Sequence, residues 1–202
     1  MENGVKMSVN KYIENNTYVD ENEKEIIRFG LSMMITSVIV LMVAVVISFM
    51  MSMLIEGILL LVAIIVLRQY AGGYHSKSQR VCAIISCLIY SACLLFIKHS
   101  LINGVIQLVL CVAAILVIFF IAPVDNANNE LSISEKKHLG KKVRISLSLE
   151  VLVFVILLVS ENTYWSEIIV VSMIIVATLV LIGFIENKVR GLDDGLSDRY
   201  MR

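Results

Sequence analysis

Proline, cysteine and charged residues are all scarce in this sequence. Among its 202 residues there are one proline and four cysteines, and only 17% are Asp, Glu, Lys or Arg. Cys87, Cys93 and Cys111 lie inside long apolar runs, which excludes the disulfide framework of a small secreted protein. The formal net charge is zero, so the basic excess typical of nucleic-acid-binding proteins is absent and we expect no nucleic-acid partner.

Two further features are missing from the chain. A zinc site built from His75, Cys82 and Cys87 would lack the paired, closely spaced ligands that such sites use, so we expect no metal and no cofactor. The first apolar run is too long for a cleaved secretory signal and has no small-residue cleavage site. We therefore expect this run to remain in the mature protein as a membrane span.

Apolar residues dominate what is present. The chain is 58% hydrophobic with a mean hydropathy of +0.87, far above the usual value for a soluble domain. Apolar runs occur at roughly 31–53, 55–70, 81–97, 101–121, 145–160 and 167–185. Because a helix needs about 20 residues to cross a hydrocarbon layer about 30 Å thick, these runs predict an all-α, polytopic membrane protein with about six transmembrane helices. The second and fifth runs are near or below the required length. Four spans, with the first or last pair not fully crossing, remain the alternative.

We interpret 1–202 as a single membrane domain. Residues 1–30 form a cytoplasmic or interfacial segment, which the helical spacing of Val5, Val9, Tyr12 and Ile13 makes a candidate amphipathic helix. The remaining segments are spans 1 and 2 at 31–70, a cytoplasmic loop at 68–82, spans 3 and 4 at 81–121, a basic cytoplasmic loop at 122–144, spans 5 and 6 at 145–186, and a cytoplasmic tail at 187–202. Turns are expected within 52–57 and at 103–104, and Pro123 should end the fourth span.

The basic residues indicate the orientation of the chain. With six spans and cytoplasmic N- and C-termini, all of the 17 lysines and arginines except Lys98 fall on the inner side. This is the distribution that the positive-inside rule describes. We therefore expect a multi-pass protein of the cell membrane, in contact with lipid.

The loop 68–82 contains the residues with the clearest chemical potential. His75 and Cys82 are seven residues apart, so on one unbroken helix they would stand about 10 Å apart along the axis. A thiolate and imidazole that exchange a proton must approach to about 3 to 3.5 Å. The chain must therefore bend between them, and Gly72 and Gly73 supply conformational freedom just before the histidine.

A new helix after this bend would place Cys82 in its first two turns. Ser76 with Gln79, or Ser78 alone, can cap such a helix. A helix N-terminus and a nearby imidazolium both favour thiolate over thiol, and the imidazolium has the larger effect. A cysteine near the end of a membrane helix is more often a packing residue, and a loop histidine beside basic residues is more often interfacial. Spacing alone leaves both roles open.

This loop resembles the AgrB family, the accessory gene regulator B proteins, which are membrane cysteine peptidases of quorum-sensing systems in Gram-positive bacteria. The likeness rests on Arg68 at the end of a span, on Gly-Gly-x-His from Gly72 to His75, and on Cys82 seven residues after that histidine. Size, span number and a cytoplasmic N-terminus also agree. The resemblance therefore covers nearly the whole chain.

A second element after the fourth span supports the resemblance. It reads Ala-Pro-Val-Asp from Ala122 to Asp125 and leads to Asn128 and a basic cluster. The family often continues into a Lys/Arg-Pro pair where this chain has Asn129 and Glu130. Because of this difference, the resemblance does not define a role for this loop.

The resemblance implies cleavage of an AgrD-like propeptide on the cytoplasmic side, with removal of its C-terminal tail. Cys82 would attack the scissile carbonyl to form a thioester, with His75 acting as base and then as acid. A cysteine or serine of the propeptide would then close a thiolactone or lactone ring. Gly72, Gly73 and Arg68 are carried over as site-supporting residues, the glycines for a backbone conformation and the arginine for loop anchoring or substrate contact.

Other groups are candidates for assisting roles. Glu150 lies about five residues into the fifth span and is a candidate third group, with pairing to Arg144 or nearby serines as the structural alternative. Asp125 is an alternative partner that could orient His75. A basic cluster could bind an acidic propeptide tail, although such clusters more often orient the protein and contact lipid. Its members are Lys136, Lys137, Lys141, Lys142 and Arg144.

Two other functions compete with a peptidase. One is a peptide export component, in which polar residues would line a path through the spans, and the other is a non-enzymatic membrane scaffold or sensor. The scarcity of charges within the spans, where we find Glu56 and Glu150, argues against transport. The sequence leaves the oligomeric state open, a homodimer included.

Overall fold

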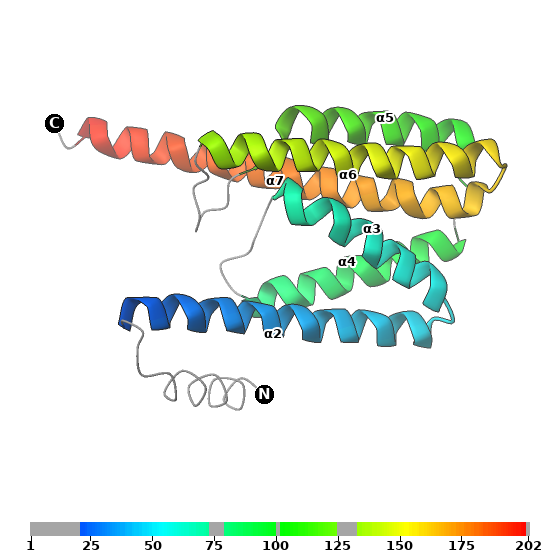
Figure 1. The fold of residues 1–202 in the computed structure, drawn as a ribbon, viewed down its shortest axis with the longest axis horizontal. Helices are drawn as coiled ribbons and strands as arrows, with labels where there is room; N and C mark the ends of the chain where they lie inside the picture. Colours follow the sequence, from blue (N-terminus) through cyan, green and yellow to red (C-terminus); the bar gives the residue numbers. More distant parts are fainter. Residues whose placement is uncertain (1–20, 73–78, 100–101, 125–132, 201–202) are drawn as a thin grey trace. The chain divides into compact units, whose positions relative to one another are not determined.

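The computed structural model describes residues 21–72, 79–99, 102–124 and 133–200. These ranges form α-helices that coincide with the six apolar runs, so the expected all-α fold is confirmed (Figure 1). The helices are α2 (Glu21–Met50), α3 (Leu54–Ala71), α4 (Gln79–His99), α5 (Gly104–Ile121), α6 (Ile133–Val159) and α7 (Thr163–Tyr200). The candidate amphipathic segment within residues 1–20 lies outside the described residues.

Within the part of the chain that the structure describes, four helices are long and apolar enough to cross a membrane. They are Leu54–Ala71, Val81–His99, Gly104–Ile121 and Thr163–Val189, with mean hydropathies of 2.0, 2.3, 3.0 and 3.1. Met34–Met50 of α2 is a shorter apolar helix, and α6 begins with a charged stretch before its apolar part. The multi-span membrane fold is therefore confirmed within the described residues, while six crossings remain a prediction.

The chain divides into two compact units. Of the described residues, 21–47 and 79–91 belong to the first unit, which contains most of α2 and the first part of α4. The second unit contains α3, α5, α6, α7 and the last part of α4. The loop and helix ends described below, apart from the start of α4, all belong to this second unit.

Helix α7 is central to the second unit because it packs against α3, α5 and α6. Figure 1 shows α5, α6 and α7 lying side by side. The core joins Leu67 of α3, Ile118 of α5, Phe154 of α6 and Met173 of α7, all with at most 1% of their surface exposed. In a bilayer the lipid is as apolar as these side chains, so close packing and polar contacts hold such helices together.

A buried polar network joins α5 to α7. The Gln107 amide nitrogen donates to the carbonyl oxygens of Ile102 at 3.0 Å and Thr163 at 2.9 Å. The Ser166 hydroxyl donates to the Gln107 amide oxygen at 2.5 Å. Gln107 is fully buried, and these three bonds satisfy an amide that would otherwise be costly in an apolar core.

The helix ends follow from local sequence. Asn103 caps α5, because its side chain accepts from the Val105 amide at 3.1 Å, and this confirms the turn expected at 103–104. Ala122 has an extended conformation (φ −78°, ψ 146°), as expected for a residue before proline, so α5 ends there. Ser52, with a φ of 57°, lies in the turn between α2 and α3. The turn expected within 52–57 is therefore present but shorter than predicted, because α3 begins at Leu54.

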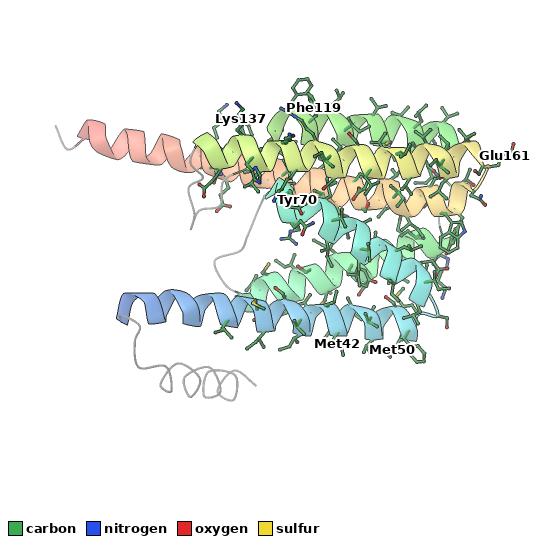
Figure 2. All side chains as sticks on the ribbon, in the orientation of Figure 1. Met42, Met50, Tyr70, Phe119, Lys137 and Glu161 are labelled. Carbon is green, nitrogen blue, oxygen red and sulfur yellow. The ribbon has the colours of Figure 1, made fainter. Side chains whose placement is uncertain are left out.

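Large apolar side chains cover the outside of the helices. Met42 and Met50 of α2 are 63% and 78% exposed, and Phe119 of α5 is 46% exposed. Figure 2 shows these three side chains projecting from their helices. Such surfaces would promote aggregation in water, whereas a bilayer solvates them.

Two segments are more helical than the sequence predicts. The second half of the expected loop at 122–144 is helical from Ile133 onward, and α7 continues through the expected tail to Tyr200. The stretch from Ile133 to Arg144 is rich in Lys, Arg and Glu, which form helices readily. Hydropathy alone therefore placed these helix ends too close to the apolar runs.

Candidate active site

Cys82 lies at the start of α4. It is the fourth residue of this helix, which begins at Gln79, and its side chain is half-buried. This agrees with the prediction of a new helix that carries Cys82 in its first two turns. All four cysteines fall within the described ranges, and none of them forms a disulfide.

Several predicted site residues lie outside the described residues. These are His75, Gly73 and Asp125, together with Ser76 and Ser78, which we expected to cap α4. The proposed pairing of His75 with Cys82 therefore stays a prediction, as does the orientation of His75 by Asp125.

Gly72 ends α3 with a backbone conformation suited to glycine. Its φ is 69° and its ψ is −143°, and its amide donates to the Arg68 carbonyl oxygen at 3.3 Å. A side chain is disfavoured at this positive φ. A Cβ at this position would also collide with the carbonyl oxygen of Val124. Both the conformation and the space therefore require glycine here.

The two sequence elements that carry the family resemblance meet at this point. Gly72 and Val124 form an isolated parallel β-bridge, and the Val124 amide donates to the Ala71 carbonyl oxygen at 3.1 Å. Ala71 and Val124 are buried, with 0% and 6% of their surface exposed. The start of the loop 68–82 is therefore held against the chain that leaves α5. The sequence analysis treated the two elements separately and did not predict this contact.

The first turns of α6 complete this region of the second unit. The Pro123 ring lies 3.5 Å from where a Cβ on the buried Gly140 would stand. The Lys142 ammonium lies 5.3 Å from the centre of the Tyr70 ring, within the range of a cation–π contact. We call the backbone and side chains of 68–72, 122–124 and 140–144 the junction, because they join the ends of α3, α5 and α6.

The basic cluster lies on α6. Arg144 stands over the Phe119 ring of α5, with 5.2 Å between the guanidinium carbon and the ring centre. Lys137 and Tyr70 are labelled near the same end of the second unit in Figure 2. The five basic side chains are exposed and are Lys136, Lys137, Lys141, Lys142 and Arg144.

Comparison with known protein families matches residues 6–182 to the family described as Accessory gene regulator B. The chain belongs to the accessory gene regulator B family. The matched region includes both loop elements and Cys82. Membership gives the protein a role in the accessory gene regulator system, with association with a membrane and with an AgrD-type propeptide.

Two relatives come from Clostridium perfringens. An AgrB-like protein 2 of strain 13 (type A) is 29% identical over 160 residues, which is 73% of each chain. An AgrB-like protein of strain SM101 (type A) is 29% identical over 131 residues, which is 61% of each chain. No solved structure matches the chain.

Glu150, the candidate third group of this AgrB-family chain, lies in the core of the second unit. It is 5% exposed, and neither carboxylate oxygen has a hydrogen-bond partner. The neighbouring polar side chains are Cys111 of α5 and Ser172 of α7. Arg144, the suggested partner, instead stands over Phe119. A catalytic role for Glu150 stays a prediction.

Sequence reasoning missed a second buried acid, Glu167. This residue of α7 is 2% exposed, and its Oε1 has no hydrogen-bond partner. Glu56 of α3 accepts a hydrogen bond from the Tyr164 hydroxyl at 3.1 Å. Glu167 was read as the start of the last apolar run, whereas α7 begins four residues earlier, at Thr163. The spans therefore carry more acidic residues than the argument against transport assumed.

Proposed function

We propose that this AgrB-family protein is a membrane cysteine endopeptidase that removes the C-terminal tail of an AgrD-like propeptide. The observation that carries the proposal is the family match over 6–182, which includes the Gly-Gly-x-His element and Cys82. The position of Cys82 supports it, because the fourth residue of α4 lies near the positive end of the helix dipole.

The first chemical step forms an acyl-enzyme. His75 accepts the Cys82 proton, and the thiolate attacks the carbonyl carbon of the scissile bond. A carbon–sulfur bond forms, and the carbon–nitrogen bond breaks as His75 returns the proton to the leaving nitrogen. The tail departs with a free amino group, and the remaining peptide is bound to Cys82 as a thioester.

The second step closes a ring. A thiol or hydroxyl within the bound peptide attacks the thioester carbonyl, and Cys82 leaves with its proton restored. An enzyme thioester and a product thiolactone have similar free energies, so ring closure is nearly isoergic once the acyl-enzyme exists. Water must be excluded, because it would hydrolyse the thioester. A site at the membrane interface would limit competing hydrolysis.

The reaction is proposed to occur on the cytoplasmic side of a Gram-positive cell membrane. The basic cluster of α6 supports this orientation for the junction, since positive residues accumulate on the cytoplasmic side. Tyr70 and Phe119, with their cationic partners Lys142 and Arg144, have the composition expected at a membrane interface. Both chain termini would then be cytoplasmic.

The same cluster is proposed to bind the propeptide tail. Lys137 and Lys141 are exposed and one turn apart on α6, so they present adjacent positive charges on one helix. An acidic tail would be attracted to this surface in a salt-dependent manner. Lys142 extends the surface to Tyr70, close to the start of the loop that carries His75.

Cleavage by purified protein in liposomes tests the proposal. Cys82→Ala and His75→Ala should each abolish release of the tail from a synthetic AgrD-like propeptide. Cys87→Ala is the matched control, because Cys87 is a half-buried cysteine of the same helix, and it should cleave at the wild-type rate. Tail release by Cys82→Ala at that rate would refute the peptidase assignment. Mass spectrometry of the wild-type protein should detect the N-terminal part of the propeptide attached to Cys82.

A further inference from the structure

We propose that the neighbouring surfaces of α5 and α6 form a binding site for one anionic phospholipid. Lys141 and Arg144 of α6 bind the phosphate of the headgroup, and exposed apolar side chains that follow them bind an acyl chain. The site lies within the second unit, and it does not depend on the proposed peptidase activity.

The two cations of this site are not neutralised by acidic side chains. Lys141 and Arg144 are exposed, and within the described residues neither forms an ion pair. They are three residues apart on α6, so their side chains are neighbours on the helix surface. The acids of α6 are Glu135 in its first turn and the buried Glu150. The surface therefore keeps a net positive charge that an anion can neutralise.

The Arg144 guanidinium is held in place by α5. Its carbon lies 5.2 Å from the centre of the Phe119 ring. A cation–π contact engages the charge of the guanidinium but not its N–H donors, and a guanidinium can donate two of these to the oxygens of one phosphate. Because the ring already restricts the arginine, less side-chain freedom is lost when a phosphate binds.

A row of exposed apolar side chains follows Lys141 on α6. Its members recur every three or four residues, so they lie on one face of the helix. Each is between 55% and 61% exposed, and they are Ile145, Leu149, Leu152 and Ile156. From the first to the last the row is about 17 Å long at 1.5 Å per residue. One leaflet of the hydrocarbon core is about 15 Å thick, so the row matches the length of an acyl chain in one leaflet.

Helix α5 contributes a second apolar row beside the first. It packs mainly against α7 and contacts α6 less extensively. Phe119, Leu116 and Val112 therefore remain 46%, 51% and 47% exposed. On both helices the apolar row begins at the level of Arg144 and Phe119. A charged group followed by apolar rows is the pattern that an anionic lipid complements, with its phosphate above its acyl chains.

Other occupants fit this surface less well. A soluble anion, such as an acidic peptide tail, would gain nothing from the apolar rows. Lys137 lies about 10 Å further along α6 from Arg144, so the surface proposed for the tail extends away from the rows, with Lys141 adjoining both. A second copy of the chain, placed symmetrically on this face, would bring like charges together.

Native mass spectrometry of the full chain, released from nanodiscs with equal amounts of phosphatidylglycerol and phosphatidylcholine, tests the site. The wild type should retain one phosphatidylglycerol in preference to phosphatidylcholine. Arg144→Gln should lower this preference by about fivefold. Arg144→Lys keeps the charge but not the paired donors, and should lose less. Phe119→Leu leaves the arginine in place without its ring contact and should also lose less.

Lys188→Gln is the matched control, because it removes one exposed positive charge from α7, outside the site. It should retain the wild-type preference. An equal loss in Lys188→Gln and Arg144→Gln would overturn the inference, since any nearby charge would then suffice. So would the absence of a preference in the wild type, or displacement of the lipid by millimolar inorganic phosphate. A predominant lipid-free dimer of the wild type would assign the surface to a second copy and would also overturn it.

Discussion

Among the described residues, Glu150 alone has both carboxylate oxygens buried without a hydrogen-bond partner. Its position suited a third catalytic group, because it lies within a span at a depth comparable with that of Cys82. In the structure it lies in the core of the second unit, with Cys111 of α5 and Ser172 of α7 as its polar neighbours. The depth of Glu150 within the span, which the sequence indicates, could not distinguish a catalytic group from a core residue. Depth does not specify which face of α6 is buried.

Glu150→Gln tests the role of this carboxyl. Glutamine keeps the size of the side chain and removes any charge that the core would have to hold, so the thermal unfolding midpoint should stay the same or rise. Tail cleavage should remain within about threefold of the wild-type rate. Glu167→Gln, which neutralises the other buried acid, is the matched control. A hundredfold loss confined to Glu150→Gln would instead identify Glu150 as part of the catalytic group.

At the scale of single elements, α6 combines a basic surface with a span. Its first turns carry the exposed Lys137 and Lys141, and its later turns carry the core residue Phe154. The sequence predicted the charged stretch as a loop because the apolar pattern begins only after Arg144. Its helical structure places the basic side chains on the same helix that contributes residues 140–144 to the junction.

A double charge reversal tests whether this surface binds the propeptide. Lys137→Glu with Lys141→Glu should raise KM by about tenfold at low salt and leave kcat within about twofold, since exposed charges act on encounter and binding. The increase should shrink as salt screens the charges. Lys188→Glu, an exposed lysine of α7, is the control. An unchanged KM in the double variant would assign the cluster to lipid contact and orientation alone.

How much the sequence could predict differs between elements. The positions of the six helices could be predicted from the long apolar runs, because a hydrophobic stretch of this length has few structural alternatives. The glycine pair and the Ala-Pro-Val-Asp element could both be identified in the sequence. The contact between them could not be predicted. Gly72 and Val124 are far apart in the sequence and pair through their backbones, which leave no side-chain pattern to read. The Gln107 network was missed for a related reason, since one of its acceptors is the main chain of α7.

At the scale of the whole molecule, the number of membrane crossings depends on α6, as it does on the shorter apolar part of α2. Between Lys137 and Val159 the helix is about 33 Å long at 1.5 Å per residue, enough to cover a hydrocarbon core of about 30 Å. Lys137 and Glu161 are labelled near opposite ends of this helix in Figure 2. The helix therefore has the length of a full crossing. Its charged start explains why it does not count among the four helices that are apolar enough to cross a membrane.

Cysteine labelling in intact cells tests this topology. Lys137→Cys should react with a membrane-impermeant maleimide only after the cells are permeabilised, because the positive-inside rule places this end in the cytoplasm. Glu161→Cys, in the exposed turn before α7, should react without permeabilisation. Unsubstituted protein provides the background. Labelling of both positions from the same side would show that α6 does not cross, and would favour the four-span alternative.

The pairing of Gly72 with Val124 has a practical consequence for exchanging parts between relatives. A chimaera that takes the loop at 68–82 from one protein and the segment at 122–124 from another would join two backbones that evolved apart. The carbonyl that approaches Gly72 leaves no room for compensation by a larger residue. These two segments should therefore be transplanted together when parts are exchanged between family members.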